Sequence, residues 1–274
     1  MRIVILYSGG LDSLIMAEYA KEHNPNDEII KVFFDIGQEY GWKERAALPP
    51  DVIVHDMKWY QAQGVDKEGI NSGSIFIPGR NQVFITIAAC KYLPDEIWLG
   101  ALQGEIHDKA TDKNFKFRDM MTETLSYVLS PFKEGGVRVR FRLAERGWGK
   151  LEATRWACSH GMKEAILASS SCMHPDYDNC GECVVCLRRW GIFTQLGLKE
   201  DYVVDPVFAK SNQKMLLEMI DSLIGLYETH YDEYRLREIL PALELRFPDK
   251  DLIEIREIIR CGSIPMKNTT TGTN

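Results

Sequence analysis

The chain begins with a short apolar run that leads directly into a glycine-containing loop and then into a helical pattern. Ile3 to Tyr7 predicts a buried strand, and Leu11 to His23 carries apolar residues at helical spacing. The loop between them reads Ser8-Gly9-Gly10-Leu11-Asp12-Ser13. Glycines let the backbone turn tightly and bring N–H groups close to an anion, and the helix N-terminus adds a favourable dipole. This unit therefore predicts a phosphate-binding site.

The side chains of this loop indicate how it would hold phosphate. The hydroxyls of Ser8 and Ser13 can donate to phosphate oxygens, whereas a carboxylate at Asp12 would repel them directly. Asp12 fits the loop if a magnesium ion lies between it and the phosphates. No lysine follows the loop as the Walker pattern requires, and the dinucleotide pattern GxGxxG is also absent. The remaining alternative is a glycine turn that only caps a helix.

Apolar runs alternate with helical patterns along the first half of the chain. The further strands expected are 29–34, 52–54 and 97–99, and the further helices are one that ends at Leu48, 81–93 and 117–129. This alternation predicts an α/β fold, with a mostly parallel sheet covered by helices on both faces. Ligands of such sheets bind beyond the carboxyl ends of the strands. After about residue 213 only helices are expected, at 214–228, 233–240 and 251–260.

Composition limits the cellular setting. The 274 residues contain no run of eighteen apolar residues, so we expect no membrane span. The N-terminus lacks the features of a signal peptide, so we expect a cytoplasmic protein with reduced thiols. The net charge of −7 argues against broad, non-specific binding to nucleic acid, because phosphates are repelled on average.

Four of the seven cysteines lie within fifteen residues. Cys172, Cys180, Cys183 and Cys186 have the spacing C-x7-C-x2-C-x2-C. In a reducing compartment, clustered cysteines bind metal more often than they form disulfides. Four thiolates complete the tetrahedral shell of a structural zinc ion and leave no open position for a catalytic water. The pattern therefore predicts structural Zn²⁺, with an iron–sulfur cluster as the alternative.

Several segments resemble known families. The SGGxDS loop after an N-terminal strand resembles the PP-loop of the adenine-nucleotide alpha-hydrolase superfamily. That resemblance implies that ATP is cleaved to AMP and pyrophosphate, and that AMP is transferred to a substrate oxygen. Further segments resemble the 7-cyano-7-deazaguanine synthases, in the family's order and up to about Leu198. They are Phe34-Asp35-Ile36-Gly37-Gln38, Phe76-Ile77-Pro78-Gly79-Arg80-Asn81, Trp148-Gly149-Lys150-Leu151-Glu152, and the run from Cys172 through Cys180-Gly181-Glu182-Cys183 to Arg189.

The resemblance implies a reaction. Members of that family convert 7-carboxy-7-deazaguanine to the nitrile with ATP and ammonia, in queuosine and archaeosine precursor synthesis. It therefore implies a ligase that uses ATP, Mg²⁺ and Zn²⁺, a small-molecule deazaguanine substrate and ammonia. Adenylation makes AMP the leaving group, so that ammonia can attack a carboxylate that is otherwise a poor electrophile.

The catalytic candidates are Asp12, Arg80 and Lys150. Arg80 is suited to clamp a phosphate or carboxylate, and its alternative is a surface ion pair. Lys150 has an ordinary helix start as its alternative, and Asp35 is expected either to hold metal or ribose or to cap a strand end. The residues expected to bind ATP are Tyr7, Ser8, Gly9, Gly10, Leu11, Asp12, Ser13, Leu14, Asp35, Gln38, Arg80 and Asn81.

Two regions depart from the family. The family carries a glycine-tyrosine-proline-aspartate-cysteine segment where this chain has residues 105–114, near the expected substrate position. Residues 199–262 extend past the PP-loop synthase domain, expected at 1–198, as a helical unit, and 263–274 are polar and expected to be disordered. Three roles are open for the added helices: holding a protein partner, packing across a homodimer, or stabilising the fold.

These departures keep two other interpretations open. A paralogue in a phage or antiviral system would use the same adenylation to attach a deazapurine to DNA, tRNA or protein. Arg138, Arg140 and Arg142 alternate with apolar residues and predict three arginines on one face of a strand, where they would meet an anionic partner or blunt a solvated edge. A non-catalytic nucleotide-binding subunit is the third interpretation, although the loop residues are all intact.

Overall fold

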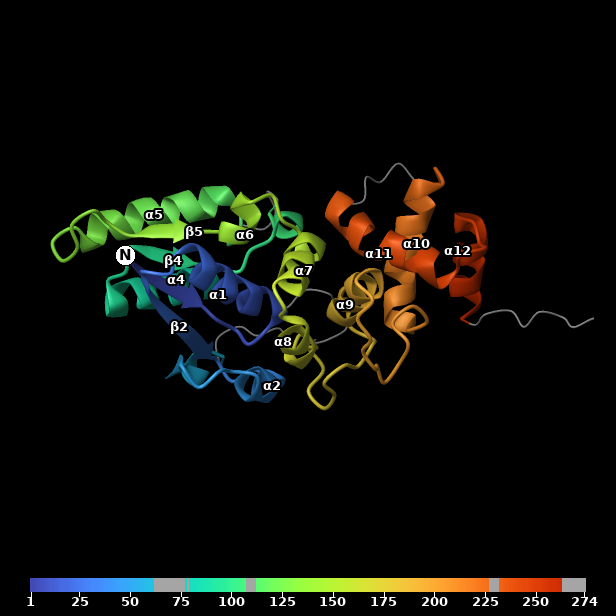
Figure 1. The fold of residues 1–274 in the computed structure, drawn as a ribbon, viewed down its shortest axis with the longest axis horizontal. Helices are drawn as coiled ribbons and strands as arrows, with labels where there is room; N and C mark the ends of the chain where they lie inside the picture. The colour runs from blue at the N-terminus through green and yellow to red at the C-terminus, as the bar shows by residue number, and fades with distance from the viewer. Residues whose placement is uncertain (62–76, 78, 107–111, 227–231, 263–274) are drawn as a thin grey trace, which may run out of the picture.

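The computed structural model describes residues 1–61, 77, 79–106, 112–226 and 232–262. Its order of elements is an α/β region followed by helices alone (Figure 1). No helix in these ranges is long and apolar enough to cross a lipid bilayer. The predicted tail at 263–274 lies outside the described residues, as do Phe76 and Pro78.

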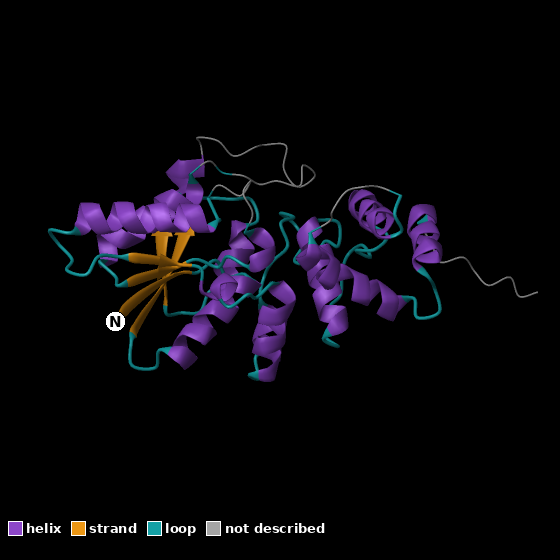
Figure 2. Cartoon of the chain, turned by 90° about the horizontal axis from the view of Figure 1, so that it is seen from above, coloured by secondary structure: helices purple, strands orange, loops and turns teal. Residues whose placement is uncertain are grey.

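The sheet has five strands in the order β3-β2-β1-β4-β5, and every pair is parallel. The strands are β1 (Arg2–Leu6), β2 (Glu28–Asp35), β3 (Val52–Asp56), β4 (Glu96–Trp98) and β5 (Arg138–Arg140). The predicted α/β fold with a parallel sheet is therefore confirmed. Because β1 lies between β2 and β4, the loops that follow these three strands meet at one edge of the sheet (Figure 2).

Alternate residues of β1 enter two cores, one on each face of the sheet. Ile3 and Ile5 pack with α1 (Leu11–His23) and α7 (Lys150–Ser159). Val4 and Leu6 pack with α4 (Arg80–Tyr92) and α5 (Phe115–Leu129). This alternation is what the period of two in a strand produces when both faces are covered. The remaining elements of this half are α2 (Gly41–Ala46), α3 (Lys58–Gln61), η2 (Gln103–Glu105), α6 (Arg142–Glu145), α8 (Lys163–Ala168) and α9 (Val184–Gln195).

The C-terminal helices have a core of their own. They are α10 (Lys210–Leu223), α11 (Glu233–Arg246) and α12 (Leu252–Cys261). Leu187 and Trp190 of α9 belong to the same core, so α9 joins these helices to the rest of the chain (Figure 1). The division at 198/199 stays a prediction. The helix predicted at 214–228 is wrong at both ends, and Gly225 in the left-handed region follows its last turn.

The helix predicted to stop at Leu240 continues through Pro241 to Arg246. Proline lacks the N–H that would bond to the carbonyl four residues earlier, here that of Arg237. Gln195 of α9 donates its amide to that carbonyl at 3.0 Å, and to the Glu238 carbonyl at 2.8 Å. A side chain from a neighbouring helix therefore satisfies the acceptor that proline leaves open, and α11 does not end.

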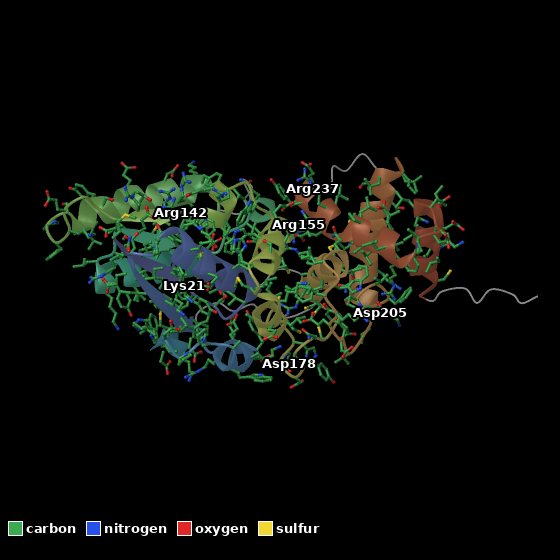
Figure 3. All side chains as sticks on the ribbon, viewed as in Figure 1. Lys21, Arg142, Arg155, Asp178, Asp205 and Arg237 are labelled. Atoms are coloured by element: carbon green, nitrogen blue, oxygen red, sulfur yellow. The ribbon has the colours of Figure 1, made fainter. Side chains whose placement is uncertain are left out.

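The arginine prediction was wrong in part. Arg138 and Arg140 lie on the edge strand β5. Arg142, labelled in Figure 3, instead begins α6. All three contact Glu96, at 3.5, 3.5 and 2.6 Å. Arg140 also pairs with Glu145 at 2.7 Å. The basic charge of this edge is therefore matched by carboxylates.

The packing of α11 on α9 leaves no room for a side chain at Gly191. A Cβ there would lie 2.4 Å from the Glu238 carbonyl oxygen. We expect Gly191→Ala to lower the free energy of unfolding by about 2 kcal/mol or more, because the two helices must separate. The measurement is urea unfolding followed by tryptophan fluorescence.

Gly41→Ala is the matched control, because its Cβ would meet nothing closer than 3.9 Å. Its helix position tolerates alanine, so we expect no loss of stability. Equal losses in the two variants would contradict the close approach of α11 to α9.

Candidate active site

The phosphate loop is held by its own side chains. The Ser13 hydroxyl donates to the Gly10 carbonyl at 2.9 Å and accepts from the Ser8 N–H at 3.1 Å. Gly9 has φ +73°, and a Cβ there would lie 2.7 Å from the Glu44 carbonyl oxygen. Only glycine fits this conformation and this approach, so the loop is shaped before any ligand binds.

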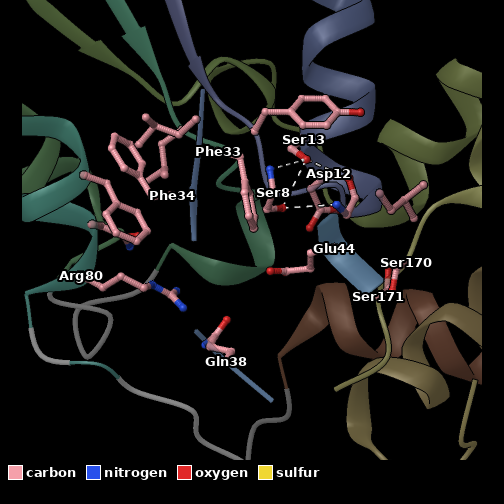
Figure 4. A pocket seen from close by; sticks show the side chains of 18 of the residues that line it. Ser8, Asp12, Ser13, Phe33, Phe34, Gln38, Glu44, Arg80, Ser170 and Ser171 are labelled. Carbon is pink, nitrogen blue, oxygen red and sulfur yellow. Dashed lines mark hydrogen bonds between the residues drawn. The ribbon is translucent and has the colours of Figure 1, made fainter. Parts of the chain in front are cut away.

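A cavity of about 320 Å³ opens over the loop (Figure 4). Two sets of side chains flank the loop because β2 and β4 lie on opposite sides of β1. The set on the β2 side includes apolar groups that suit a flat base, namely Val32, Phe33, Phe34, Ile36 and Phe84 of α4. The set on the β4 side is charged and includes Glu105 and Lys113, joined by Lys150 and Arg188.

Asp12 and Lys150, two of the predicted catalytic residues, form an ion pair in this cavity. Lys150 Nζ lies 3.0 Å from Asp12 Oδ2, and the lysine side chain is only 8% exposed. Asp12 Oδ1 is buried and has no hydrogen-bond partner among the described residues. An unpaired buried carboxylate oxygen is costly unless a ligand or ion completes it. The site therefore has an acceptor position suited to a hard cation such as Mg²⁺.

Gln38 lies on the β2 side, where its amide faces the Tyr40 hydroxyl. Arg80, Gln38 and Glu44 face the same space below the loop (Figure 4). Burial raises the pKa of the Glu44 carboxyl to about 7, against the attraction of Arg80. Burial likewise raises the pKa of the Tyr40 hydroxyl. The β2 side therefore holds a hydrogen-bond donor, the Gln38 amide, and a carboxylic acid with a pKa near neutrality, Glu44.

Not every predicted ATP-binding residue lines the cavity. Gly9 and Leu14 are absent from its lining, and Asp35 is also outside it. Asp35 caps the strand end, accepting from the Gly37 N–H at 3.0 Å and from Arg45 at 2.5 Å. The other nine are lining residues: Tyr7, Ser8, Gly10, Leu11, Asp12, Ser13, Gln38, Arg80 and Asn81.

Asn81 reaches the segment that departs from the family. Its amide donates to the Asp112 carbonyl at 3.1 Å and to the Asp112 carboxylate at 2.9 Å. Glu105 and Lys113, from the two ends of that segment, lie 3.4 Å apart in the cavity wall. Burial opposes ionisation of Glu105, but Lys113, Arg188 and Lys150 more than offset it and lower its pKa to about 2. The altered segment therefore contributes a fixed anion and a cation to the site.

Sequence reasoning missed these charged residues. Glu105 and Lys113 were noticed only as a departure, and Arg188 only as the end of the cysteine pattern. Glu44 and Tyr40 lie a few residues beyond Gln38, and their distance along the chain from the loop hides their place in the cavity. No local signal marked Arg188, because residues two apart on a helix do not share a face, and the burial of Cys186 therefore does not predict that of Arg188.

The four predicted zinc ligands are brought together and buried. The sulfurs of Cys172, Cys180, Cys183 and Cys186 lie within 4.8 Å of one another. Backbone N–H groups point at them, including Cys180 N–H to Cys172 Sγ at 3.4 Å and Cys186 N–H to Cys183 Sγ at 3.4 Å. Such donors stabilise thiolates, which are the metal-binding form. The cluster can hold a zinc ion, and no gap in its four sulfurs is left for water.

Lys43 of α2 connects the cysteine loop to the phosphate loop. Its buried ammonium donates to the carbonyls of Cys172, His174 and Tyr177, at 2.9, 2.5 and 2.7 Å. The next residue, Glu44, supplies the carbonyl that packs on Gly9. The cysteine loop and the phosphate loop are thereby fixed to the same short helix. The cysteine cluster thus supports the cavity from outside without lining it.

The family model described as queuosine biosynthesis protein QueC matches residues 2–197. The chain belongs to this family. Curated relatives agree: the 7-cyano-7-deazaguanine synthase of a Nitratiruptor species is 27% identical over 222 residues, covering 73% of this chain and 97% of the relative. That of Pyrococcus furiosus is 27% identical over 251 residues, covering 75% of this chain and 98% of the relative. That of a Caulobacter species is 28% identical over 228 residues, covering 69% of this chain and 88% of the relative.

Family membership supports an enzyme that binds ATP and acts on a small molecule. The PP-loop resemblance is thereby confirmed. The match ends at residue 197, before α10 begins. The helices α10 to α12 are therefore outside the matched region, whereas the phosphate loop, the cysteine cluster and Arg188 are inside it.

Replacing one ligand should empty the metal site. We expect wild-type protein to carry about one zinc ion per chain and Cys183→Ser to carry almost none, with a lower melting temperature, because three sulfurs hold the ion poorly. Elemental analysis measures the zinc content, and thermal unfolding measures the melting temperature. Cys158→Ser, outside the cluster, is the control and should keep its zinc. Iron in place of zinc in the wild type would favour the iron–sulfur alternative.

The raised pKa of Glu44 should make stability depend on pH. The folded state holds the Glu44 proton up to about pH 7, whereas the unfolded state releases it near 4.5. The stability that this group contributes is therefore full below pH 4.5 and is lost as the pH rises through 7. The free energy of unfolding of Glu44→Gln, measured relative to that of wild type in nucleotide-free protein, should therefore increase by about 1–3 kcal/mol as the pH rises from 4.5 to 8.

Urea unfolding at several pH values measures this gain. Glu18→Gln removes a carboxylate at the surface of α1, remote from the cavity lining, and serves as the control. A gain that is the same at pH 4.5 and pH 8 would contradict the raised pKa.

Proposed function

We propose that this chain is a C–N bond-forming ligase that converts 7-carboxy-7-deazaguanine to 7-cyano-7-deazaguanine with ATP and ammonia. The observation that carries the proposal is the buried oxygen Asp12 Oδ1, which lies in a preshaped phosphate loop and has no hydrogen-bond partner among the described residues. Membership of a family whose curated relatives are named as such synthases supports the choice of reaction.

The β2 side of the cavity is the proposed ATP side. Phe33, Phe34 and Ile36 would contact the base, and the N–H groups at the start of α1 would receive the phosphates. Arg80 would clamp a phosphate through its bidentate fork. On the β4 side the charged residues would receive the deazaguanine, with its carboxylate directed to Lys150.

Asp12 would hold a magnesium ion through the oxygen that has no partner in the described residues. When bound, such an ion neutralises charge on ATP and stabilises the charge that develops at phosphorus. Lys150 holds the other oxygen of Asp12, so the carboxylate is aimed before the ion arrives.

Two adenylations complete the reaction. In the first, the substrate carboxylate attacks the α-phosphorus of ATP and pyrophosphate leaves. Ammonia then attacks the carbonyl carbon, AMP leaves with its electron pair, and one proton is released to give the amide. In the second, the amide oxygen attacks the α-phosphorus of another ATP and pyrophosphate leaves. AMP then departs with the C–O electron pair, and nitrogen loses two protons to give the nitrile. Arg80, Lys150 and the loop N–H groups would stabilise the charge at phosphorus in both.

A macromolecular acceptor remains an outcome of the test and not a second proposal. The arginines that suggested an anionic partner are paired with Glu96 and Glu145. A homodimer or a protein partner bound through α10 to α12 remains a prediction without an observation that favours it.

The test is pyrophosphate release by zinc-loaded protein with Mg²⁺, ATP, ammonium and 7-carboxy-7-deazaguanine, with mass spectrometry of the base. We expect pyrophosphate together with the nitrile, and a loss of at least about 100-fold in Asp12→Asn, because the proposed metal ligand is removed. Glu18→Gln makes the same chemical change on the same helix and should be unaffected.

The products separate the alternatives. Amide without nitrile would indicate an enzyme that stops after the first adenylation. Absence of turnover from folded wild-type protein would overturn the small-molecule reaction and favour a macromolecular acceptor.

A further inference from the structure

Arg188 enters the cavity wall from α9, and its charge is matched from outside the family-matched region. The arginine is 6% exposed and Glu238 of α11 is 1% exposed. Arg188 Nε donates to Glu238 Oε2 at 2.6 Å, and Nη2 donates to Oε1 at 2.7 Å. Two parallel bonds of this kind fix both the position and the plane of a guanidinium group.

The remaining nitrogen of Arg188 points toward the altered segment. Nη1 lies 3.6 Å from Glu105 Oε1, and Lys113 lies 3.4 Å from Glu105 Oε2. Glu105, Lys113 and Arg188 all line the cavity, whereas Glu238 does not. A line of alternating charges therefore runs from α11 through Arg188 to the β4 side of the site. Arg235 supports its outer end by contacting Glu238 at 3.3 Å.

Three glycines allow α11 to pack closely on the elements that carry the site. A Cβ at Gly104, directly before Glu105, would lie 2.8 Å from Tyr234 Cβ, and one at Gly149, directly before Lys150, would lie 2.6 Å from Tyr234 Cδ1. Gly191 of α9 meets the Glu238 carbonyl in the same way. The residues that precede Glu105 and Lys150 are thus packed directly on α11. This helix is fixed to the elements that carry the site.

We propose that Glu238 is a positioning residue for the substrate side of the cavity: it holds Arg188, which in turn holds Glu105, so that the helices beyond residue 197 complete the acceptor site. The assignment of this side to the acceptor rests on the proposed function. Glu105, at the start of the segment that departs from the family, and Glu238 of the C-terminal helices meet here through one arginine. The helices then set acceptor specificity in addition to stabilising the fold.

The chemistry of this side defines the acceptor that it fits. Glu105 is an anion fixed between Arg188 and Lys113, so it can accept hydrogen bonds from an N–H edge without gaining a proton. Lys150 stands nearer the phosphate loop, beside Asp12, and can face a carboxylate on the same molecule. A small planar acceptor with N–H donors at one end and a carboxylate at the other matches both groups. A ring without such donors should bind poorly.

The test compares Glu238→Gln with wild type in full-length, zinc-loaded protein. We expect the KM for 7-carboxy-7-deazaguanine to rise about 10-fold or more and the KM for ATP to change less than about 2-fold, because only acceptor contacts depend on Arg188. Glu238→Asp keeps the charge and should recover part of the acceptor KM. It also serves if Glu238→Gln folds poorly.

Asp221→Asn is the matched control for a merely structural effect. Asp221 is a buried carboxylate of α10 that pairs with Arg256 of α12, away from the cavity lining. Its loss should lower the melting temperature and leave both KM values unchanged. An acceptor KM that moves equally in Asp221→Asn, or that stays unchanged in Glu238→Gln, would overturn the proposal.

Crystal structures of wild type and Glu238→Gln separate this proposal from the proposed reaction. If wild-type protein does not turn over the deazaguanine, the reaction fails, and the structures still decide the positioning role. Displacement of the Arg188 guanidinium from the cavity wall in the variant supports that role. An unmoved Arg188 that keeps its distance to Glu105 overturns it.

Discussion

The parallel pairing of β1 with β2 on one side and β4 on the other determines where everything else lies. It brings the ends of three strands to one edge and places the phosphate loop between an apolar side and a charged side. Since the loop is shaped by Gly9 against the Glu44 carbonyl and by Ser13 on Gly10, it needs no ligand to form. The cost of organising the anion site is met during folding, which is the usual basis of preorganised electrostatic stabilisation.

Two side chains that do not line the cavity support it. Lys43 fixes the cysteine loop to the helix that packs on Gly9, and Glu238 fixes Arg188 in the cavity wall. The partners of both side chains come from distant parts of the chain. Removing Arg188 or Glu238 leaves an uncompensated buried charge, and removing Lys43 leaves three carbonyls without their donor. The cavity is therefore sensitive to residues that do not line it.

Sequence patterns predicted the fold well where interactions between residues close together along the chain determine the structure. The alternation of apolar runs and helical patterns predicted the parallel sheet, and the cysteine spacing predicted the cluster that the structure brings together. Prediction failed where a distant group intervenes. Pro241 should have ended a helix, but Gln195 of α9 satisfies the carbonyl that it leaves open. Arg142 matched a strand pattern, but it begins α6 and pairs with Glu96.

The sequence by itself determined the phosphate loop and the four clustered sulfurs, because each depends on residues close together along the chain. Only the tertiary structure decided the charged wall on the β4 side of the cavity. Glu105, Arg188 and Glu238 come from three separate elements, and their charges stabilise one another only after burial brings them together. No spacing in the chain encodes that encounter. Electrostatic interactions between distant residues become strong only when packing excludes water from between them.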